Sequence, residues 1–197
     1  MSDRLTRPLV LIAAFAGSLA AGLLVVLWLA GGFRGVTAAA SIGGPFQLTD
    51  QSGQAVTEQN LKGKPTLIFF GFTHCPDICP TSLFEISEVL RAMGKDADRV
   101  NAWFVSVDPE RDTAAAMKDY LSSFDPHLKG LTGDQASVAK VISSFRVYAK
   151  KVPLKDGDYT MDHTALIYLM DRDGKFIAPF NLKRKPEEAA EDLKRYL

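Results

Sequence analysis

The sequence predicts an α/β fold in which helices cover a mixed central sheet. Apolar runs at residues 65–73 and 99–108 have the composition of strands that are buried on both faces of a sheet. Segments with apolar residues at helical spacing follow them, at 80–93, 112–124, 134–145 and 185–197. Alternating strands and helices of this kind form a layered domain around one core.

Each element has its own signals in the sequence. Residues 45–50 and 55–64 suggest a short strand or hairpin at the start of the domain. The helix at 80–93 has apolar residues on one face and a terminating glycine, Gly94. Asp112 and Asp134 are the expected N-caps of the next two helices.

The last third of the domain predicts a hairpin and a closing helix. Residues 163–180 read as two strands around the turn "DRDG", and Pro186 with two glutamates suits the first turn of a helix over 185–197. The complete order of elements matches a thioredoxin-like fold. We therefore expect residues 45–197 to form one domain of that type.

A long apolar run precedes this domain. Residues 8–30 contain no charged residue, and a run of this length is long enough for a transmembrane helix. A cleaved signal peptide is the alternative, because "AAAS" at 38–41 resembles a cleavage site, but signal h-regions span only about 7–15 residues. Two arginines precede the run and only Arg34 follows closely. This bias predicts a cytoplasmic segment at 1–7 and an exported C-terminal domain.

These features predict a single-pass protein of the bacterial inner membrane, with its C-terminal domain in the periplasm. No Arg- and Ser-rich transit peptide precedes the apolar run. Residues 31–44 contain five glycines and predict a flexible linker. Residues 41–197 carry 20 Lys and Arg against 22 Asp and Glu, a net charge of −2. This balance argues against a nucleic-acid partner, which requires a concentrated positive face.

The stretch "GFTHCPDICPTSL" at 71–83 contains both cysteines of the chain, Cys75 and Cys79. It lies where a buried strand ends and a helix begins, which is the edge at which α/β proteins bind ligands. A helix N-terminus also lowers the pKa of a thiol and favours the reactive thiolate. Three interpretations follow: a structural disulfide, a redox dithiol or two ligands of a metal site.

The spacing of Cys75 and Cys79 helps to distinguish these three interpretations. A bridge closing so short a loop removes little chain entropy, so a purely structural disulfide gains little. Thiol–disulfide exchangers of this fold use Cys-x-x-Cys, whereas three residues separate these two cysteines. A third ligand between the sulfurs would favour a metal site, although a redox pair stays open.

Histidine is the expected third ligand. His163 is predicted to open a hairpin strand that faces the cysteines in thioredoxin-like folds, and His74 directly precedes Cys75. Two thiolates and an imidazole suit Cu(I), and hold Cu(II) with an additional weak ligand. Structural zinc usually takes four protein ligands. Possible supporting residues are His74, Asp162 beside His163, and Asp108, for which a turn or capping role is favoured over a role near the metal.

Three blocks of the chain together resemble the Sco/SenC family of copper chaperones. They are "FFGFTHCPDICPTSL" (69–83), "VSVDPERDT" (105–113) and "DHTALIYLMDRDGKF" (162–176), and the similarity covers about residues 45–197. The resemblance implies a copper site formed by Cys75, Cys79 and His163. It also implies delivery of copper to the dinuclear copper centre of cytochrome c oxidase subunit II, so that the protein is a metallochaperone rather than an enzyme.

The resemblance leaves two other functions open. Members of the family are also discussed as thiol–disulfide oxidoreductases that reduce the cysteines of that subunit, and a redox or copper sensor is a third possibility. The cysteines must be reduced to bind copper, yet a disulfide between Cys75 and Cys79 is expected to form in the oxidising periplasm. We therefore expect a thioredoxin-like thiol reductase as a second partner.

Overall fold

The computed structural model describes residues 3–32, 41–155 and 157–197. Helix α1 (Asp3–Gly32) belongs to one compact unit and residues 41–197 form another. Side chains of α1 are described for residues 14–28, and most of the predicted linker at 31–44 lies outside the described residues. In these described ranges, no helix has both the length and the apolar character needed to cross a membrane.

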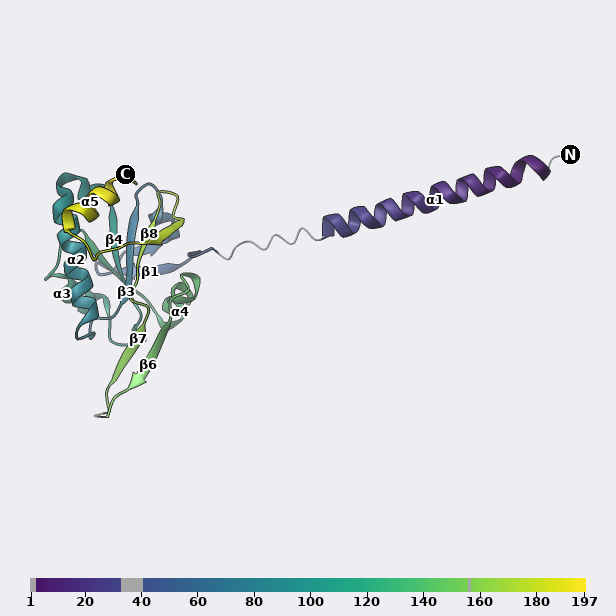
Figure 1. Cartoon of the computed structure of the whole chain (residues 1–197). Coiled ribbons are helices and arrows are strands. Elements are labelled where there is room, and N and C mark those ends of the chain that lie inside the picture. Colours follow the sequence, from purple (N-terminus) through teal and green to yellow (C-terminus); the bar gives the residue numbers. More distant parts are fainter. Residues whose placement is uncertain (1–2, 33–40, 156) are drawn as a thin grey trace. The chain divides into compact units, whose positions relative to one another are not determined.

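The described strands of the C-terminal unit form one large mixed sheet and one small one (Figure 1). The large sheet has the order β2-β1-β5-β4-β3-β8-β9, with β3, β4 and β5 parallel and the other pairs antiparallel. Its strands are β1 (Gln47–Asp50), β2 (Ala55–Thr57), β3 (Thr66–Gly71), β4 (Asn101–Ser106), β5 (Leu128–Thr132), β8 (Ile167–Met170) and β9 (Phe176–Pro179). The small sheet is a hairpin of β6 (Ala149–Pro153) and β7 (Tyr159–His163).

Helices cover both faces of the large sheet. They are α2 (Ile78–Met93), α3 (Ala114–Leu121), α4 (Gln135–Ser144) and α5 (Pro186–Lys194), with 3₁₀ turns at η1 (Glu58–Leu61) and η2 (Gly94–Arg99). A Cβ atom on Gly130 would meet Leu121 and Met117 of α3, which places this helix directly on β5. Helix α2 packs against α5.

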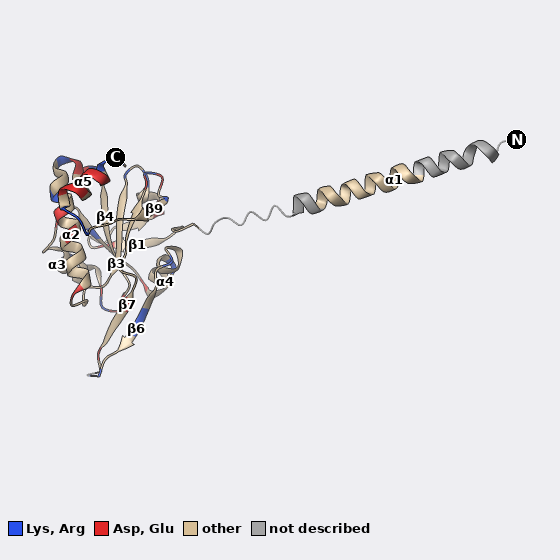
Figure 2. Ribbon diagram, viewed as in Figure 1, with Lys and Arg blue, Asp and Glu red and all other residues tan. Residues whose placement is uncertain are grey.

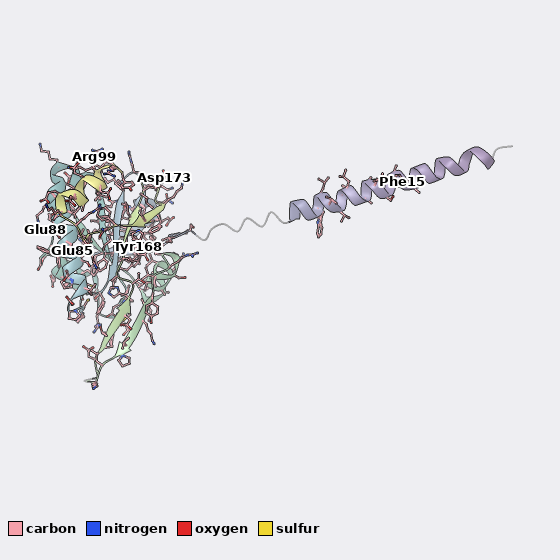
Figure 3. The ribbon with its side chains drawn as sticks, in the orientation of Figure 1. Phe15, Glu85, Glu88, Arg99, Tyr168 and Asp173 are labelled. Atoms are coloured by element: carbon pink, nitrogen blue, oxygen red, sulfur yellow. The ribbon has the colours of Figure 1, made fainter. Side chains whose placement is uncertain are left out.

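The core divides into two aromatic layers at β3, because successive residues of a strand point to opposite faces. Phe69 stacks on Phe104 on the face that α2 and α3 cover. Phe70 points the other way and contacts Phe145, at the end of α4, and Tyr168 of β8. Tyr168 is labelled in Figure 3. All of β3 is buried, as its continuous apolar run predicts.

Two predicted details are wrong. The N-cap of α3 is Thr113, whose side chain accepts a hydrogen bond from the backbone N–H of Ala116, and not Asp112. His163 does not open a strand of the predicted hairpin, because it is the last residue of β7 and β8 begins only at Ile167. The N-cap at Asp134 is confirmed, since its carboxylate accepts from the N–H of Ser137 at 2.7 Å.

Candidate metal centre

Both cysteines lie at the carboxyl end of β3, in the middle of the sheet. Cys75 is in the loop that follows this strand and Cys79 is in the first turn of α2. The backbone N–H of Cys79 donates to the Sγ of Cys75 at 3.4 Å. Cys75 is half-buried and Cys79 is completely buried, so Cys75 is the more exposed of the two cysteines.

The structure brings His163 to these two sulfur atoms from a distant part of the chain. The Sγ atoms of Cys75 and Cys79 and a ring nitrogen of His163 lie within 4.8 Å of one another. The Nε2 of His163 is 3.6 Å from the Sγ of Cys79. Since sulfur and nitrogen ligands bind a metal at about 2.0–2.3 Å, ligands of one ion lie roughly 3.5–4 Å apart. The three atoms need only a small contraction to share an ion.

The ring of His163 is oriented for this role. Its Nδ1 lies 3.1 Å from the carbonyl oxygen of Thr164, to which it donates as an N–H, so that Nε2 presents its lone pair to the sulfur atoms. Phe69 and Phe72 flank the ring at 6.2 and 5.7 Å between centroids. The aromatic neighbours and the backbone carbonyl together restrict the imidazole.

Burial dominates the electrostatics of Cys79. Desolvation raises the pKa of this thiol well above its ordinary value, and the nearby Cys75 raises it further, although a hydrogen bond from the backbone of Phe72 opposes both. The expectation that the helix N-terminus would lower the pKa is therefore wrong for Cys79. Without a metal this thiol stays protonated at neutral pH, and a metal ion must displace its proton.

The other expected site residues lie outside the cluster. His74 is exposed, and its Nδ1 is 3.0 Å from the hydroxyl of Thr73. Asp162 is exposed and lies opposite Lys150 in the register of the hairpin. The backbone carbonyl of Thr164, and not Asp162, orients the ring of His163. His127, the remaining histidine, contacts Asp125 instead.

Asp108 forms the turn that the sequence suggested. Its backbone carbonyl accepts hydrogen bonds from the N–H groups of Arg111 and Asp112 just after β4. Its buried carboxylate also forms an ion pair with Arg111 and accepts a hydrogen bond from the hydroxyl of Tyr159. It therefore links the end of β4 to the hairpin that carries His163.

Asp112 is the site residue that the sequence analysis misassigned. Its buried carboxylate accepts from the backbone N–H and the hydroxyl of Thr73, two positions before Cys75, and from the hydroxyl of Ser106. Burial raises the pKa of this carboxyl group despite these hydrogen bonds. The sequence signal for this role was the place of Asp112 in "VSVDPERDT", because that block includes the end of a buried strand beside the cysteine loop.

Comparisons with known proteins agree with this fold. Residues 34–197 match the SCO1/SenC family. The chain is 41% identical over 155 residues to an SCO2-like protein of Rickettsia felis, covering 78% of this chain and 76% of that protein. It is 42% identical over 153 residues to the mitochondrial SCO1 homolog of Homo sapiens, covering 76% and 51% of the two chains.

Solved structures give the same result. ScoI of Bradyrhizobium japonicum with copper bound is 83% identical, with a TM-score of 0.79 over 80% of this chain and all of that chain. Yeast Sco1 with copper bound is 38% identical, with a TM-score of 0.70 over 80% and 91% of the two chains. BsSco, in which a disulfide switch was identified, is 25% identical, with a TM-score of 0.63 over 78% and 91%. The chain therefore belongs to the SCO1/SenC family.

Proposed function

We propose that this protein is a copper metallochaperone that binds one copper ion through Cys75, Cys79 and His163. The observation that carries the proposal is the convergence of two sulfur atoms and one imidazole nitrogen within 4.8 Å. Soft thiolates with an imidazole favour copper over hard cations such as magnesium or calcium. Family members of the same fold, including ScoI of Bradyrhizobium japonicum and yeast Sco1, have been solved with copper bound.

The proposed acceptor is the dinuclear copper site of cytochrome c oxidase subunit II. Support comes from the family, since BsSco is described as a member of a family of cytochrome c oxidase assembly proteins. Three ligands leave room in the coordination sphere of a bound ion, so an incoming ligand of the acceptor can bind before the chaperone's ligands dissociate. Of the two cysteines, Cys75 is the less buried.

We further propose that the domain is held at the bacterial inner membrane, on its periplasmic side, by residues 8–30. The support is the uncharged sequence of that run and the arginines before it. Carbonate-washed membranes from cells that produce the full chain should retain it, and added protease should reach it only from the periplasmic side. Recovery of the full, uncleaved chain in the soluble fraction would contradict the anchor.

A thiol–disulfide oxidoreductase is the second candidate, because the two sulfur atoms are neighbours and Cys75 is the less buried of the two residues. In this reaction the Cys75 thiolate attacks a disulfide of the acceptor and releases one acceptor thiolate. Cys79, after losing its proton, then attacks the mixed disulfide and releases the second. Two electrons pass to the acceptor, and the chain is left with a Cys75–Cys79 disulfide, which a thioredoxin-like reductase must reduce again. A redox or copper sensor would use the same pair.

Copper titration separates these functions. The reduced protein is titrated with Cu(I) or Cu(II), and stoichiometry and affinity are compared for native protein, His163→Ala and the control His74→Ala, which changes an exposed histidine outside the cluster. A chaperone should bind one equivalent. His163→Ala should lose at least the roughly 10–100-fold in affinity that even a supporting residue contributes to a metal site.

The control variant should bind copper like native protein. If both variants bind equally well, His163 is not a ligand and the proposed metal centre is wrong. If native protein binds copper weakly while His163→Ala still reduces a model disulfide at the native rate, the oxidoreductase function is favoured instead.

A further inference from the structure

The position of His163 depends on a hairpin that is not part of the main sheet. Strands β6 and β7 pair with each other, and among the described strands neither pairs with the seven-stranded sheet. Figure 1 shows this hairpin extending away from the body of the domain. His163 is the last residue of β7. Contacts that fix the hairpin to the body therefore decide where the imidazole lies.

Along α4 the hairpin leaves open space. A cavity of about 470 Å³ lies between this helix and the hairpin, and it is lined by residues such as Val138 and Ile142 of α4 and Ala149 and Met161 of the hairpin. Packing against α4 is therefore incomplete, and another contact must hold the hairpin.

Two polar contacts hold the hairpin among the described residues: the ion pair of Lys151 in β6 with Glu110 at 2.6 Å, and a larger contact centred on Tyr159, the first residue of β7. Its hydroxyl donates to the Oδ1 of Asp108 at 2.9 Å, and its backbone carbonyl accepts from the Nη1 of Arg111 at 3.0 Å. The guanidinium carbon of Arg111 lies 3.7 Å from the centroid of the tyrosine ring, in a cation–π contact. One residue of the hairpin is thus held through its hydroxyl, its ring and its backbone.

The partners of Tyr159 are themselves fixed. The Nε of Arg111 donates to the Oδ2 of Asp108 at 2.6 Å, and the two side chains are only 16% and 3% exposed. Charge-assisted hydrogen bonds with little solvent competition are strong and directional. Burial and the bond to Asp108 also raise the pKa of Tyr159 to about 12, so its hydroxyl remains a donor at physiological pH.

The same arginine reaches toward the metal centre. Its guanidinium carbon lies 5.8 Å from the centroid of Phe72, and the ring of Phe72 lies edge-on to His163 at 5.7 Å. Phe72 also directly follows β3, at the start of the loop that carries Cys75. Arg111 therefore contacts the cysteine loop on one side and the histidine hairpin on the other.

We propose that Tyr159, held by Asp108 and Arg111, is a positioning residue for His163, and that this contact sets how fast the site releases copper. The inference rests on the proposed copper-binding function. While the contact is intact, the hairpin keeps the imidazole against the sulfur atoms. When it opens, the third ligand leaves and the two thiolates alone retain the ion.

The test uses the full chain loaded with Cu(I) and a competing chelator. Tyr159→Phe removes only the hydroxyl, and Tyr148→Phe is its matched control, because Tyr148 lies beside β6 with an exposed side chain. A hydrogen bond to a charged group contributes enough that its loss should speed copper release about tenfold. Arg111→Lys retains the charge but cannot donate to Asp108 and to the carbonyl of Tyr159 from two nitrogens of one rigid group, and should act in the same direction.

A double-mutant cycle separates positioning from a general loss of structure. In the His163→Ala background, Tyr159→Phe should change copper release less than twofold, because the ligand that it positions is gone. In the copper-free protein, amide hydrogen exchange of β7 should accelerate in Tyr159→Phe and not in Tyr148→Phe, while the exchange of β3 and β4 stays unchanged.

The two proposals fail in different ways. If His163→Ala binds and releases copper like native protein, the proposed metal centre is wrong. If His163→Ala weakens copper binding but Tyr159→Phe releases copper no faster than Tyr148→Phe, the positioning role alone is wrong. It is equally wrong if the tenfold effect persists in the His163→Ala background.

Discussion

Gly71 shows how closely the site is packed at the scale of a single residue. It ends β3, next to the loop that carries the cysteines. A Cβ atom at this position would lie 2.7 Å from the Sγ of Cys79 and 2.6 Å from the ring of Phe104. Both neighbours are fully buried, so neither has room to move. Glycine is required here for close packing of a sulfur ligand.

We predict that Gly71→Ala destabilises the copper-free protein by about 1–3 kcal/mol, the usual cost of overpacking a core. It should also weaken copper binding, because the added methyl group displaces Cys79. Denaturant unfolding and chelator competition measure the two effects. Gly44→Ala is the control, since its Cβ would make only ordinary contacts at 3.6 Å or more. Equal behaviour of the two variants would contradict this account.

The buried thiol of Cys79 predicts a pH dependence of copper binding. Burial raises its pKa, so the copper-free protein holds this proton throughout the neutral range and releases it when copper binds. Affinity should therefore rise with pH, and this one proton contributes about tenfold per pH unit between pH 6 and 8. Chelator competition at several pH values measures the slope. In Cys79→Ala the slope should fall by about one proton, and an unchanged slope would assign the released proton elsewhere.

At the scale of elements, Asp112 connects the cysteine loop to the sheet. It joins Thr73 of that loop to Ser106 of β4, and its backbone carbonyl accepts from the hydroxyl of Thr132 in β5. The sequence predicts Asp112 as an N-cap because Asp and Thr are both good N-caps, but only one position can hold the cap. Thr113 takes the cap, which leaves Asp112 free to turn inward.

We predict that Asp112→Ala lowers the free energy of unfolding by about 3 kcal/mol, because several buried donors lose their acceptor. Alkylation of Cys75 in the copper-free protein should become faster as its loop loosens. Asp119→Ala is the matched control, since Asp119 is an exposed carboxylate on α3. Thermal or denaturant unfolding and alkylation kinetics give the two readouts. Native-like stability of Asp112→Ala would show that Thr73 does not depend on it.

Strands with a continuous apolar run or a clear hairpin turn were predictable, and β5 and β6 were not. The runs at 65–73 and 99–108 contain β3 and β4. Strand β6 reads "AKKVP" and is exposed along most of its length. Its basic residues are blue in Figure 2. Strand β5 contains Gly130, a residue that is depleted in strands. Neither segment carries the alternation that identifies a strand from sequence alone.

At the scale of the whole molecule, the sequence predicts the candidate ligands of the site but not the contacts that hold them in place. The chain has only two cysteines, which follow a buried strand, and three histidines, so few side chains can be the sulfur and nitrogen ligands of a metal. The contact of Tyr159 with Asp108 joins residues that are 51 positions apart in the chain. No pattern in the sequence indicates that these two segments lie side by side. Such contacts depend on where a separate hairpin docks, and local patterns do not encode that.

Global stability should also depend on pH through His127. Its Nδ1 lies 2.7 Å from Asp125 and its Nε2 lies 3.2 Å from Asp98, and these bonds raise its pKa above the unfolded value near 6.5. A raised pKa means that the folded state binds the proton more tightly, so the stabilisation is complete below pH 6.5 and is lost as pH rises through the folded pKa. Asp98 is largely exposed, so the contribution is at most about 1 kcal/mol and weakens with salt.

We predict that His127→Gln loses more stability relative to native protein at pH 5.5 than at pH 8, because only the lower pH retains the charged imidazole. Denaturant unfolding at both pH values and at two salt concentrations measures the difference. Subtracting the native curve removes the contributions of His74 and His163, which both proteins share. A deficit that is independent of pH and salt would mean that His127 acts through neutral hydrogen bonds, and the ionic pairing would be excluded.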